Sequence, residues 1–255
     1  MSLLSCNKLE IKIAEKLICQ ELSLRINAGE NWAILGMNGC GKTTLLHSLA
    51  GLLPSQAGDI LINDLNLSQL SRRQVAQQVS LLLQHQEDYF PGTVLEAVLI
   101  GRHPHIKSWQ WESDNDKQLV LEALQLVGLD DFADRAILTL SGGERQRVAL
   151  ATLLVQQTPI RLLDEPVNHL DIHHQHEVMK LLSGNSNDIA NVFVLHDVNL
   201  AARYCDHALL MPGNGETIQG ACSEVLTPGN LSTLYQHPIK EILHQDQRLF
   251  IADSH

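Results

Sequence analysis

The segment Gly36-Met37-Asn38-Gly39-Cys40-Gly41-Lys42-Thr43 constrains this 255-residue chain more than any other feature. Its spacing is that of a P-loop, and it lies between a strand pattern over 31–35 and a helical pattern over 44–52. The glycines let the backbone curl so that successive N–H groups and a helix N-terminus face phosphate oxygens. We therefore expect Lys42 to reach the β- and γ-phosphates of a nucleotide and Thr43 to hold Mg²⁺. An ordinary glycine-rich turn is the alternative, and the flanking strand and helix argue against it.

The rest of the chain has the pattern of a strand-rich α/β framework with a helical insertion. Residues 3–13 and 17–27 have strand character, and the turn residues Asn27–Glu30 predict a hairpin from the second of them into the strand at 31–35. Apolar residues then recur at helical spacing from about 84 to 157. Further strands are expected at 59–62, 79–83, 160–163, 192–195 and 208–211.

The strand expected at 160–163 runs directly into two carboxylates, Asp164 and Glu165. Beside a P-loop, this pattern predicts that Asp164 belongs to the Mg²⁺ site and that Glu165 polarises an attacking water. Alone the pattern is weak, because many strands end in acidic residues. Arg161 interrupts the apolar run, and we expect it at the strand entrance with its charged end in water.

The segment Leu140–Arg147 combines a capping box with two glycines. Ser141 and Glu144 have the capping-box spacing, so a helix with exposed N–H groups is expected to begin there. Gly142 and Gly143 let a ligand approach that backbone closely. A plain helix cap explains the serine and the glutamate, but not the glycines together with the basic residues that follow.

In order and spacing, the P-loop, Leu140–Arg147, Asp164-Glu165 and His196 resemble the motifs of ABC transporter ATPases. The resemblance covers nearly the whole chain, and Glu144 stands where the family signature usually has glutamine. It implies an α/β fold with a P-loop NTPase (RecA-like) core, an antiparallel β subdomain and an inserted α-helical subdomain. Residues 1–255 would form a single nucleotide-binding domain, with the core and β subdomain over 1–84 and 159–221, the helical subdomain over 85–158 and a C-terminal tail over 222–255.

The same resemblance assigns roles to individual residues. Gln84, or less favourably Gln86, would touch the metal and the attacking water. Asp171 would reach across a dimer, and His196 would contact the γ-phosphate. The catalytic residues are then Glu165, His196 and Gln84, and the metal ligands are Thr43, Gln84 and Asp164. The residues expected at the nucleotide are Gly36, Asn38, Gly39, Cys40, Gly41, Lys42, Thr43, Thr44, Ile13, Ser141, Gly142, Gly143, Glu144 and Asp171.

One departure from the family concerns the base. ABC ATPases normally stack an aromatic side chain from the first hairpin on adenine, and the matching position here is Ile13, with Ala14 beside it. Apolar contact would then replace stacking, with less energy and weaker base selectivity. Val167 also replaces the usual threonine or serine after Asp-Glu-Pro. Neither change touches the phosphate chemistry.

The resemblance also implies partners. Each chain would hold half of each site, so two copies would form a head-to-tail homodimer around two ATP molecules and reopen after hydrolysis. The segment near Glu87–Lys107 would receive separate transmembrane permease subunits, and a substrate-binding protein would act indirectly through them. The expected location is therefore the cytoplasmic face of the inner membrane.

The only indication of the cargo is the resemblance of short segments to ATPases of known importers. The segments Gly101–His105, Glu165–Val178 and Glu224–Thr227 resemble ATPases of importers for iron-siderophores, haem and cobalamin. An ABC ATPase for another cargo, such as molybdate, zinc or a lipid, is the alternative. A non-transport ABC ATPase acting on nucleic acid is less favoured, since a net charge of −11 disfavours a nucleic-acid partner.

Composition is consistent with a cassette whose membrane-spanning part is a separate chain. The longest apolar stretches are far below the roughly 18 residues that span a bilayer, and charges within the first apolar stretch argue against a secretory signal. Five cysteines without a C-x-x-C pair favour a reducing cytosol and isolated buried thiols. Four clustered histidines favour a solvated helix face over a zinc site, because no cysteine or carboxylate set completes one. These are His169, His173, His174 and His176.

Overall fold

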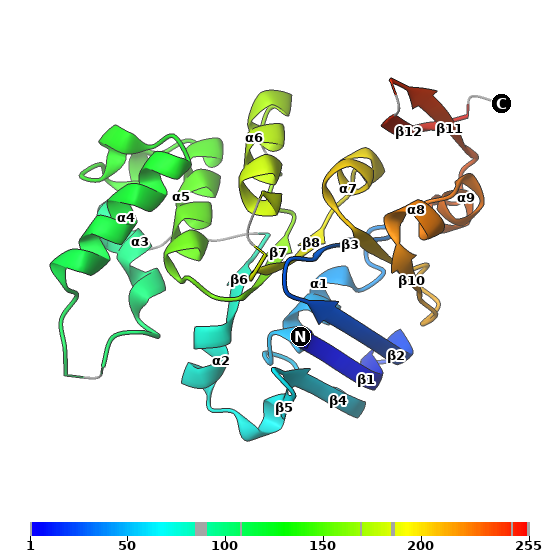
Figure 1. The fold of residues 1–255 in the computed structure, drawn as a ribbon, viewed down its shortest axis with the longest axis horizontal. Helices are drawn as coiled ribbons and strands as arrows, with labels where there is room; N and C mark the ends of the chain where they lie inside the picture. The colour runs from blue at the N-terminus through cyan, green and yellow to red at the C-terminus, as the bar shows by residue number, and fades with distance from the viewer. Residues whose placement is uncertain are drawn as a thin grey trace.

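The computed structural model describes residues 2–84, 91–107, 109–168, 170–184, 187–245 and 247–253. Within these ranges, six strands form a sheet at the centre of the molecule (Figure 1). In spatial order they are β10 (Ile218–Ala221), β9 (His207–Leu210), β3 (Asn31–Leu35), β8 (Ala190–Val194), β7 (Ile160–Asp164) and β6 (Val79–Leu82). Neighbouring strands are parallel except for β10 and β9. The carboxyl ends of β3, β6, β7 and β8 therefore lie at one edge of the sheet.

The N-terminal strands form a second, antiparallel sheet. Its order is β2 (Lys16–Asn27), β1 (Ser2–Ile13), β4 (Ala57–Ile62) and β5 (Leu65–Asn66). The predicted hairpin from β2 into β3 is wrong, because β2 pairs with β1 whereas β3 lies between β8 and β9. Burial gives the reason. All five residues of β3 are buried, which requires cover on both faces, whereas β2 exposes one face.

A lobe of helices stands at one side of the central sheet, in the part of the chain predicted to be a helical insertion (Figure 1). It contains α3 (Val94–Leu99), α4 (Asp114–Leu126) and α5 (Gly142–Val155). The helix α2 (Arg72–Gln78), which precedes β6, was not predicted. A capping box opens each of these four helices, formed by the pairs Ser71/Gln74, Thr93/Glu96, Ser113/Asp116 and Ser141/Glu144. Short 3₁₀ turns are η1 (Leu67–Gln69), η2 (Ile100–Arg102), η3 (Asp130–Phe132) and η4 (Ile137–Thr139).

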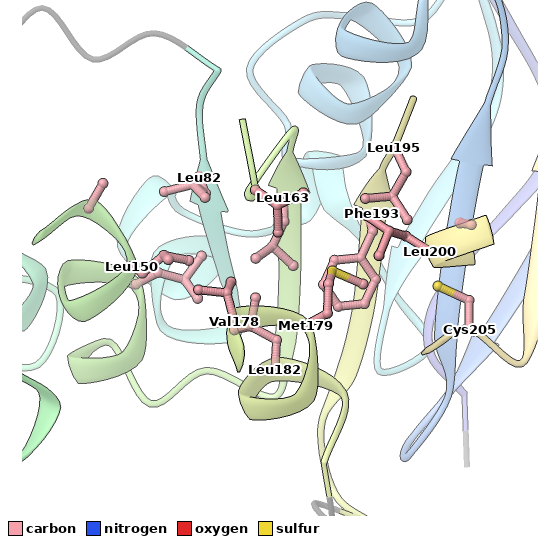
Figure 2. Packing of buried hydrophobic residues seen from close by; sticks show 14 of the residues in the cluster. Leu82, Leu150, Leu163, Val178, Met179, Leu182, Phe193, Leu195, Leu200 and Cys205 are labelled. Carbon is pink, nitrogen blue, oxygen red and sulfur yellow. The ribbon is translucent and has the colours of Figure 1, made fainter. Parts of the chain in front are cut away.

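Side chains at alternate positions of the central strands build a core on each face. Ile34 belongs to the core shared with α1 (Lys42–Leu49) and the antiparallel sheet, and Leu35 to the core beneath the other helices. Figure 2 shows the latter core, in which Leu163 and Phe193 of the sheet face α6 (Ile172–Ser183) and α7 (Val198–Tyr204). The helix α1 ends before the predicted residue 52, because Gly51 adopts a φ of +73° that closes the helix.

The C-terminal part packs against α7. After β10, α8 (Cys222–Val225) and α9 (Pro228–Tyr235) lead into a hairpin of β11 (Ile239–His244) and β12 (Gln247–Ala252). The side-chain amide of Asn199 on α7 exchanges two hydrogen bonds with the backbone of Phe250, at 2.7 and 3.1 Å. All five cysteines are buried and unpaired, as predicted. Among the described helices, none has both the length and the apolar content to cross a membrane.

Candidate active site

Several candidate residues follow directly after parallel strands of the central sheet. The P-loop follows β3, Glu165 follows β7, and Gln84 and His196 come two residues after the ends of β6 and β8. Parallel strands present their carboxyl ends at the same edge, so segments far apart in sequence converge there. The sheet topology by itself therefore brings these groups to one site.

The P-loop wraps around the N-terminus of α1. Gly41, the residue before α1, has a φ of +110°, and a Cβ added there would lie 2.5 Å from Cγ2 of Ile18. Glycine is required at this position for both reasons. The side chain of Lys42 is buried, and its ammonium donates hydrogen bonds to the carbonyls of Gly36 (2.8 Å) and Met37 (3.2 Å). The positively charged ammonium of Lys42 is thus held inside the turn of the P-loop.

The carboxylate of Glu165 is contacted by three other side chains. Its Oε2 accepts hydrogen bonds from the side-chain amides of Gln84 (2.7 Å) and Asn168, and its Oε1 lies 2.5 Å from Nε2 of His196. Glu165 is buried, and its φ of +52° turns the chain abruptly after β7. The result is a carboxylate oriented from three sides, as a general base requires.

The neighbouring carboxylate, Asp164, has a different environment. It is fully buried, and neither of its oxygens has a hydrogen-bond partner among the described residues. Burial raises the pKa of Asp164, and the nearby Thr43 hydroxyl opposes that rise without reaching hydrogen-bond geometry. Two unpartnered carboxylate oxygens beside a hydroxyl are the hard oxygen donors that Mg²⁺ prefers. The residues present therefore fit a divalent cation.

A cavity of about 630 Å³ lies over these groups, large enough for a nucleotide-sized ligand. Its walls come from the β1–β2 hairpin, the P-loop, α1 and the segments after β6, β7 and β8. The lining residues are Ile13, Lys16, Ile18, Asn38, Gly39, Gly41, Lys42, Thr43, Thr44, Gln84, Glu165, Asn168 and His196. Of the remaining candidates, Gly36, Cys40 and Asp164 are buried and do not line the cavity.

The candidates Ser141, Gly142, Gly143 and Glu144 lie at the N-terminus of α5 and do not line this cavity. Ser141 and Glu144 form the predicted capping box, in which the Glu144 carboxylate accepts from the backbone N–H of Ser141 at 2.7 Å. A Cβ added at Gly142 would meet no atom within 4 Å. The chain thus presents an exposed helix N-terminus, fixed by its cap, outside its own cavity.

Residues 19–168, more than half of the chain, match the family model described as ABC transporter. The chain belongs to the family of ABC transporter ATP-binding proteins. The chain is accordingly an ATP-binding cassette of the ABC type.

Relatives of this ABC ATPase carry names that state their cargo. The petrobactin import ATP-binding protein FpuD of Bacillus anthracis is 40% identical over 227 residues, which are 88% of this chain and 82% of that protein. The hemin import ATP-binding protein HmuV of Nocardia farcinica is 37% identical over 228 residues, which are 89% of this chain and 78% of that protein.

Among solved structures, an ABC transporter assigned to the metal-chelate type, in an inward-facing conformation, is similar with a TM-score of 0.85 at 28% identity. The match covers 99% of this chain and 98% of that one. The predicted family and the predicted fold, an α/β ABC ATPase domain with an antiparallel β subdomain and a helical subdomain, are confirmed.

In this ABC ATPase, Asp171 acts within its own chain. Its carboxylate caps α6 by accepting a hydrogen bond from the backbone N–H of His174 at 2.9 Å, and it does not line the cavity. Its role across a dimer stays a prediction. Two predicted residues, Gln86 and His169, lie outside the described part of the chain. Within that part, no group of three or more histidine, cysteine, aspartate or glutamate side chains could hold a metal ion.

Arg161 is the second residue of β7, near the start of the strand as expected. Its side chain is buried, burial lowers the pKa of its guanidinium, and Nε has no partner among the described residues.

The sequence analysis missed two members of the site. Asn168 donates to the Glu165 carboxylate, and its own backbone N–H bonds the Glu165 carbonyl at 3.1 Å in a tight turn. The spacing of the two residues, three apart after a buried strand, could have indicated this contact. The ammonium of Lys16 donates to the P-loop carbonyl of Gly39 across the cavity wall. This contact joins segments of different sheets, and no local pattern indicates it.

Proposed function

We propose that this ABC ATPase hydrolyses ATP to power the import of an iron chelate, such as a ferric siderophore or haem, through separate permease subunits. The observation that carries the hydrolytic part is the Glu165 carboxylate, held by Gln84, Asn168 and His196 in the wall of the P-loop cavity. Support for import comes from FpuD and HmuV, whose names state import of petrobactin and hemin, and from the likeness to a metal-chelate type transporter. Cobalamin, molybdate and zinc are outcomes that the test below separates.

In the proposed reaction, Lys42 and the P-loop N–H groups hold the triphosphate. Glu165 accepts a proton from a water molecule as the water oxygen bonds to the γ-phosphorus. The bond from that phosphorus to the oxygen shared with the β-phosphate breaks, and ADP leaves with the electron pair. Gln84 and His196 orient the carboxylate and contact the water and the γ-phosphate, respectively. The main contribution of the chain is to position the Glu165 carboxylate and the attacking water at the γ-phosphate.

Thr43, Gln84 and Asp164 would hold Mg²⁺. When bound, Mg²⁺ supplies positive charge that offsets the charge developing on the phosphate oxygens. The two unpartnered oxygens of Asp164 support this assignment. A direct check is Asp164→Asn, which should bind ATP with an affinity that no longer responds to added Mg²⁺.

We propose a head-to-tail homodimer in which two ATP molecules lie between the chains. Ser141, Gly142, Gly143 and Glu144 would complete the site of the other copy, with Asp171 beside them. The exposed N-terminus of α5, which faces no part of its own cavity, supports this arrangement. Closure would depend on the γ-phosphate, because it alone would contact both chains, and hydrolysis would release the dimer.

The helical lobe, predicted over 85–158, would receive the permease near Glu87–Lys107, a segment whose residues 87–90 lie outside the described part of the chain. The chain would work at the cytoplasmic face of the inner membrane. A substrate-binding protein would act through the permease rather than on this chain. The boundaries 1–84, 159–221 and 222–255 for the core and the tail stay predictions.

Uptake in a deletion strain tests the function. The strain carries the wild-type gene, Glu165→Gln or the matched control Glu177→Gln, an exposed glutamate on α6. We expect the wild type and Glu177→Gln to restore uptake of a radio-iron siderophore or of haemin, and Glu165→Gln to fail. Loss of cobalamin, molybdate or zinc uptake in the deletion strain, with normal iron uptake, would contradict the proposed cargo.

A further inference from the structure

A short segment between α3 and α4 connects two parts of the molecule that belong to different hydrophobic cores. It has the sequence Gly101-Arg102-His103-Pro104-His105-Ile106, and we call it the strap. Among the described residues that line the nucleotide cavity, none belongs to the strap. Its contacts are instead with the C-terminal end of α5 and with α2.

At the α5 end, side chains of the strap bind the last carbonyl groups of the helix. The guanidinium of Arg102 is buried and donates to the carbonyl of Val155 at 2.7 Å and to the side chain of Gln157 at 3.1 Å. Nε2 of His105 lies 2.7 Å from the carbonyl oxygen of Gln156. A helix cannot satisfy its own last carbonyls, so these contacts fix the strap to the end of α5.

The strap also packs closely against the body of α5. A Cβ added at Gly101 would lie 2.5 Å from the carbonyl oxygen of Thr152, so only glycine allows the two backbones to approach this far. Nε of Arg102 also donates to Oδ1 of Asp116 at 2.9 Å, which joins α4 to the same point. The strap and the C-terminal part of α5 therefore form one packed unit.

On its other side, the strap is held by two side chains of α2, which lies between the antiparallel sheet and the helical lobe (Figure 1). Arg73 donates from Nε to the carbonyl of Pro104 at 3.0 Å and from Nη2 to the carbonyl of Ile106 at 2.6 Å. Gln77 donates to the same Pro104 carbonyl at 2.8 Å. Val75 of α2 packs against the core that contains the buried leucines of α1, the helix that follows the P-loop. The strap thus ties the end of α5 to the part of the molecule that carries the P-loop.

The position of this tie gives it leverage over the other end of α5. The helix has 14 residues and begins after Ser141, so its N-terminus lies about 20 Å from its strap end at a rise of 1.5 Å per residue. A tilt of about 10° at the strap end would move the N-terminus by about 3 to 4 Å over that length. Misplacement of a catalytic group by about 1 Å can lower a rate by about 100-fold. Small changes in the direction of α5 would therefore be large for any nucleotide that its N-terminus contacts.

We propose that Arg73 is a positioning residue for ATP hydrolysis in the site of the other copy of the chain. Through the strap it fixes the direction of α5, and with it the place of Ser141 over the nucleotide that the other copy binds. This role rests on the proposed function, because it requires the head-to-tail dimer. Arg73 does not line the cavity of its own chain, so its loss should leave ATP binding there unchanged.

ATP binding and hydrolysis by the full chain separate the two effects. Arg73→Met should lower kcat by about tenfold, while the Kd for ATP changes by less than about twofold. Arg73→Lys should retain about half of the rate, because an ammonium can still donate to one of the two carbonyls. Arg72→Met is the matched control and should behave as wild type. Arg72 is the neighbouring exposed arginine of α2, and within the described part of the chain it makes no hydrogen bond to the strap.

A mixture of two variants tests whether Arg73 acts on the other copy's site. Arg73→Met and Lys42→Ala chains are mixed in equal amounts with ADP, and ATP is then added. In a mixed dimer, one site combines the intact P-loop of the Arg73→Met chain with the correctly held α5 of the Lys42→Ala chain. Half of the dimers are mixed, so the rate should reach about a quarter of the wild-type rate, about fivefold above that of the same amount of Arg73→Met alone.

Three results would overturn this role for Arg73. The first is a kcat of Arg73→Met equal to that of Arg72→Met. The second is a loss of ATP binding in Arg73→Met as large as its loss of kcat, which would show damage to its own P-loop site. The third is a mixture no more active than the Arg73→Met that it contains. In each of these the wild type still hydrolyses ATP; a wild-type chain that does not would overturn the proposed function as well.

Discussion

Nε2 of His196 lies 2.5 Å from Oε1 of Glu165, although the two residues follow different strands of the central sheet. The glutamate side chain is only 8% exposed, whereas the histidine side chain is 44% exposed. His196 therefore connects a buried carboxylate to the open cavity. Both residues come shortly after parallel strands that end at the same edge, so the sheet brings their side chains together.

We expect His196→Ala to impair chemistry more than binding. Without the imidazole, the carboxylate loses one of its orienting contacts and the γ-phosphate loses a donor. The kcat for ATP hydrolysis should fall by about 100-fold, while the Kd for ATP changes by less than about threefold. Phosphate release and equilibrium binding measure the two quantities. His173→Ala, at a side chain that is 76% exposed on α6, is the control and should behave as wild type. An unchanged kcat in His196→Ala would contradict the assigned role.

Ser141→Arg should abolish hydrolysis while leaving ATP binding to the P-loop of the same chain intact. The physical reason is that an arginine at the start of α5 blocks the surface that would meet the nucleotide of the other copy. Ser113→Arg is the matched control, because Ser113 opens α4 with the same kind of capping box and should retain hydrolysis.

A mixture of two inactive variants sharpens that prediction. In a head-to-tail dimer of Ser141→Arg with Lys42→Ala, one site carries both defects and the other carries none. Mixing equal amounts should therefore restore about a quarter of the wild-type rate, if the chains exchange and the sites act independently. Activity no higher than that of the separate variants would argue against sites shared between such chains.

Local patterns predicted the P-loop, the strand at 31–35 and the capped start of α5, because each depends on residues next to one another. Contacts between distant segments were not predictable in the same way. The turn residues Asn27–Glu30 indicate that the chain reverses, but they do not indicate which strand becomes a neighbour. The sequence-based prediction therefore placed β3 beside β2, in the wrong sheet. The contact between Lys16 and Gly39 depends on how two sheets pack.

Asp116 should make the helical lobe sensitive to acid. Its carboxylate accepts hydrogen bonds from Ser113 (2.6 Å) and pairs with buried Arg102 at 2.9 Å. The Ser113 hydrogen bonds, with a smaller contribution from Arg102, lower the pKa of Asp116 from 3.8 to about 2. Because the pKa is lower in the folded state, the stabilisation is present above about pH 4 and is lost as the pH falls toward 2.

Asp116→Asn should therefore lower the free energy of unfolding by about 2 kcal/mol at pH 7, and by progressively less as the pH falls toward 2. Urea unfolding followed by circular dichroism at several pH values measures the difference. Asp114→Asn, two residues away and fully exposed, should leave the free energy of unfolding close to that of the wild type. An Asp116→Asn deficit that is the same at pH 7 and near pH 2 would show that the charge is not its cause.

Sedimentation velocity of the Glu165→Gln protein is the most direct test of an ATP site completed by a second copy. This substitution removes the general base but keeps the size of the side chain, so ATP should bind and persist. With ATP and Mg²⁺ we expect a stable dimer; with ADP, or with Lys42→Ala added, we expect a monomer. A Glu165→Gln protein that binds ATP and still sediments as a monomer would contradict the shared site.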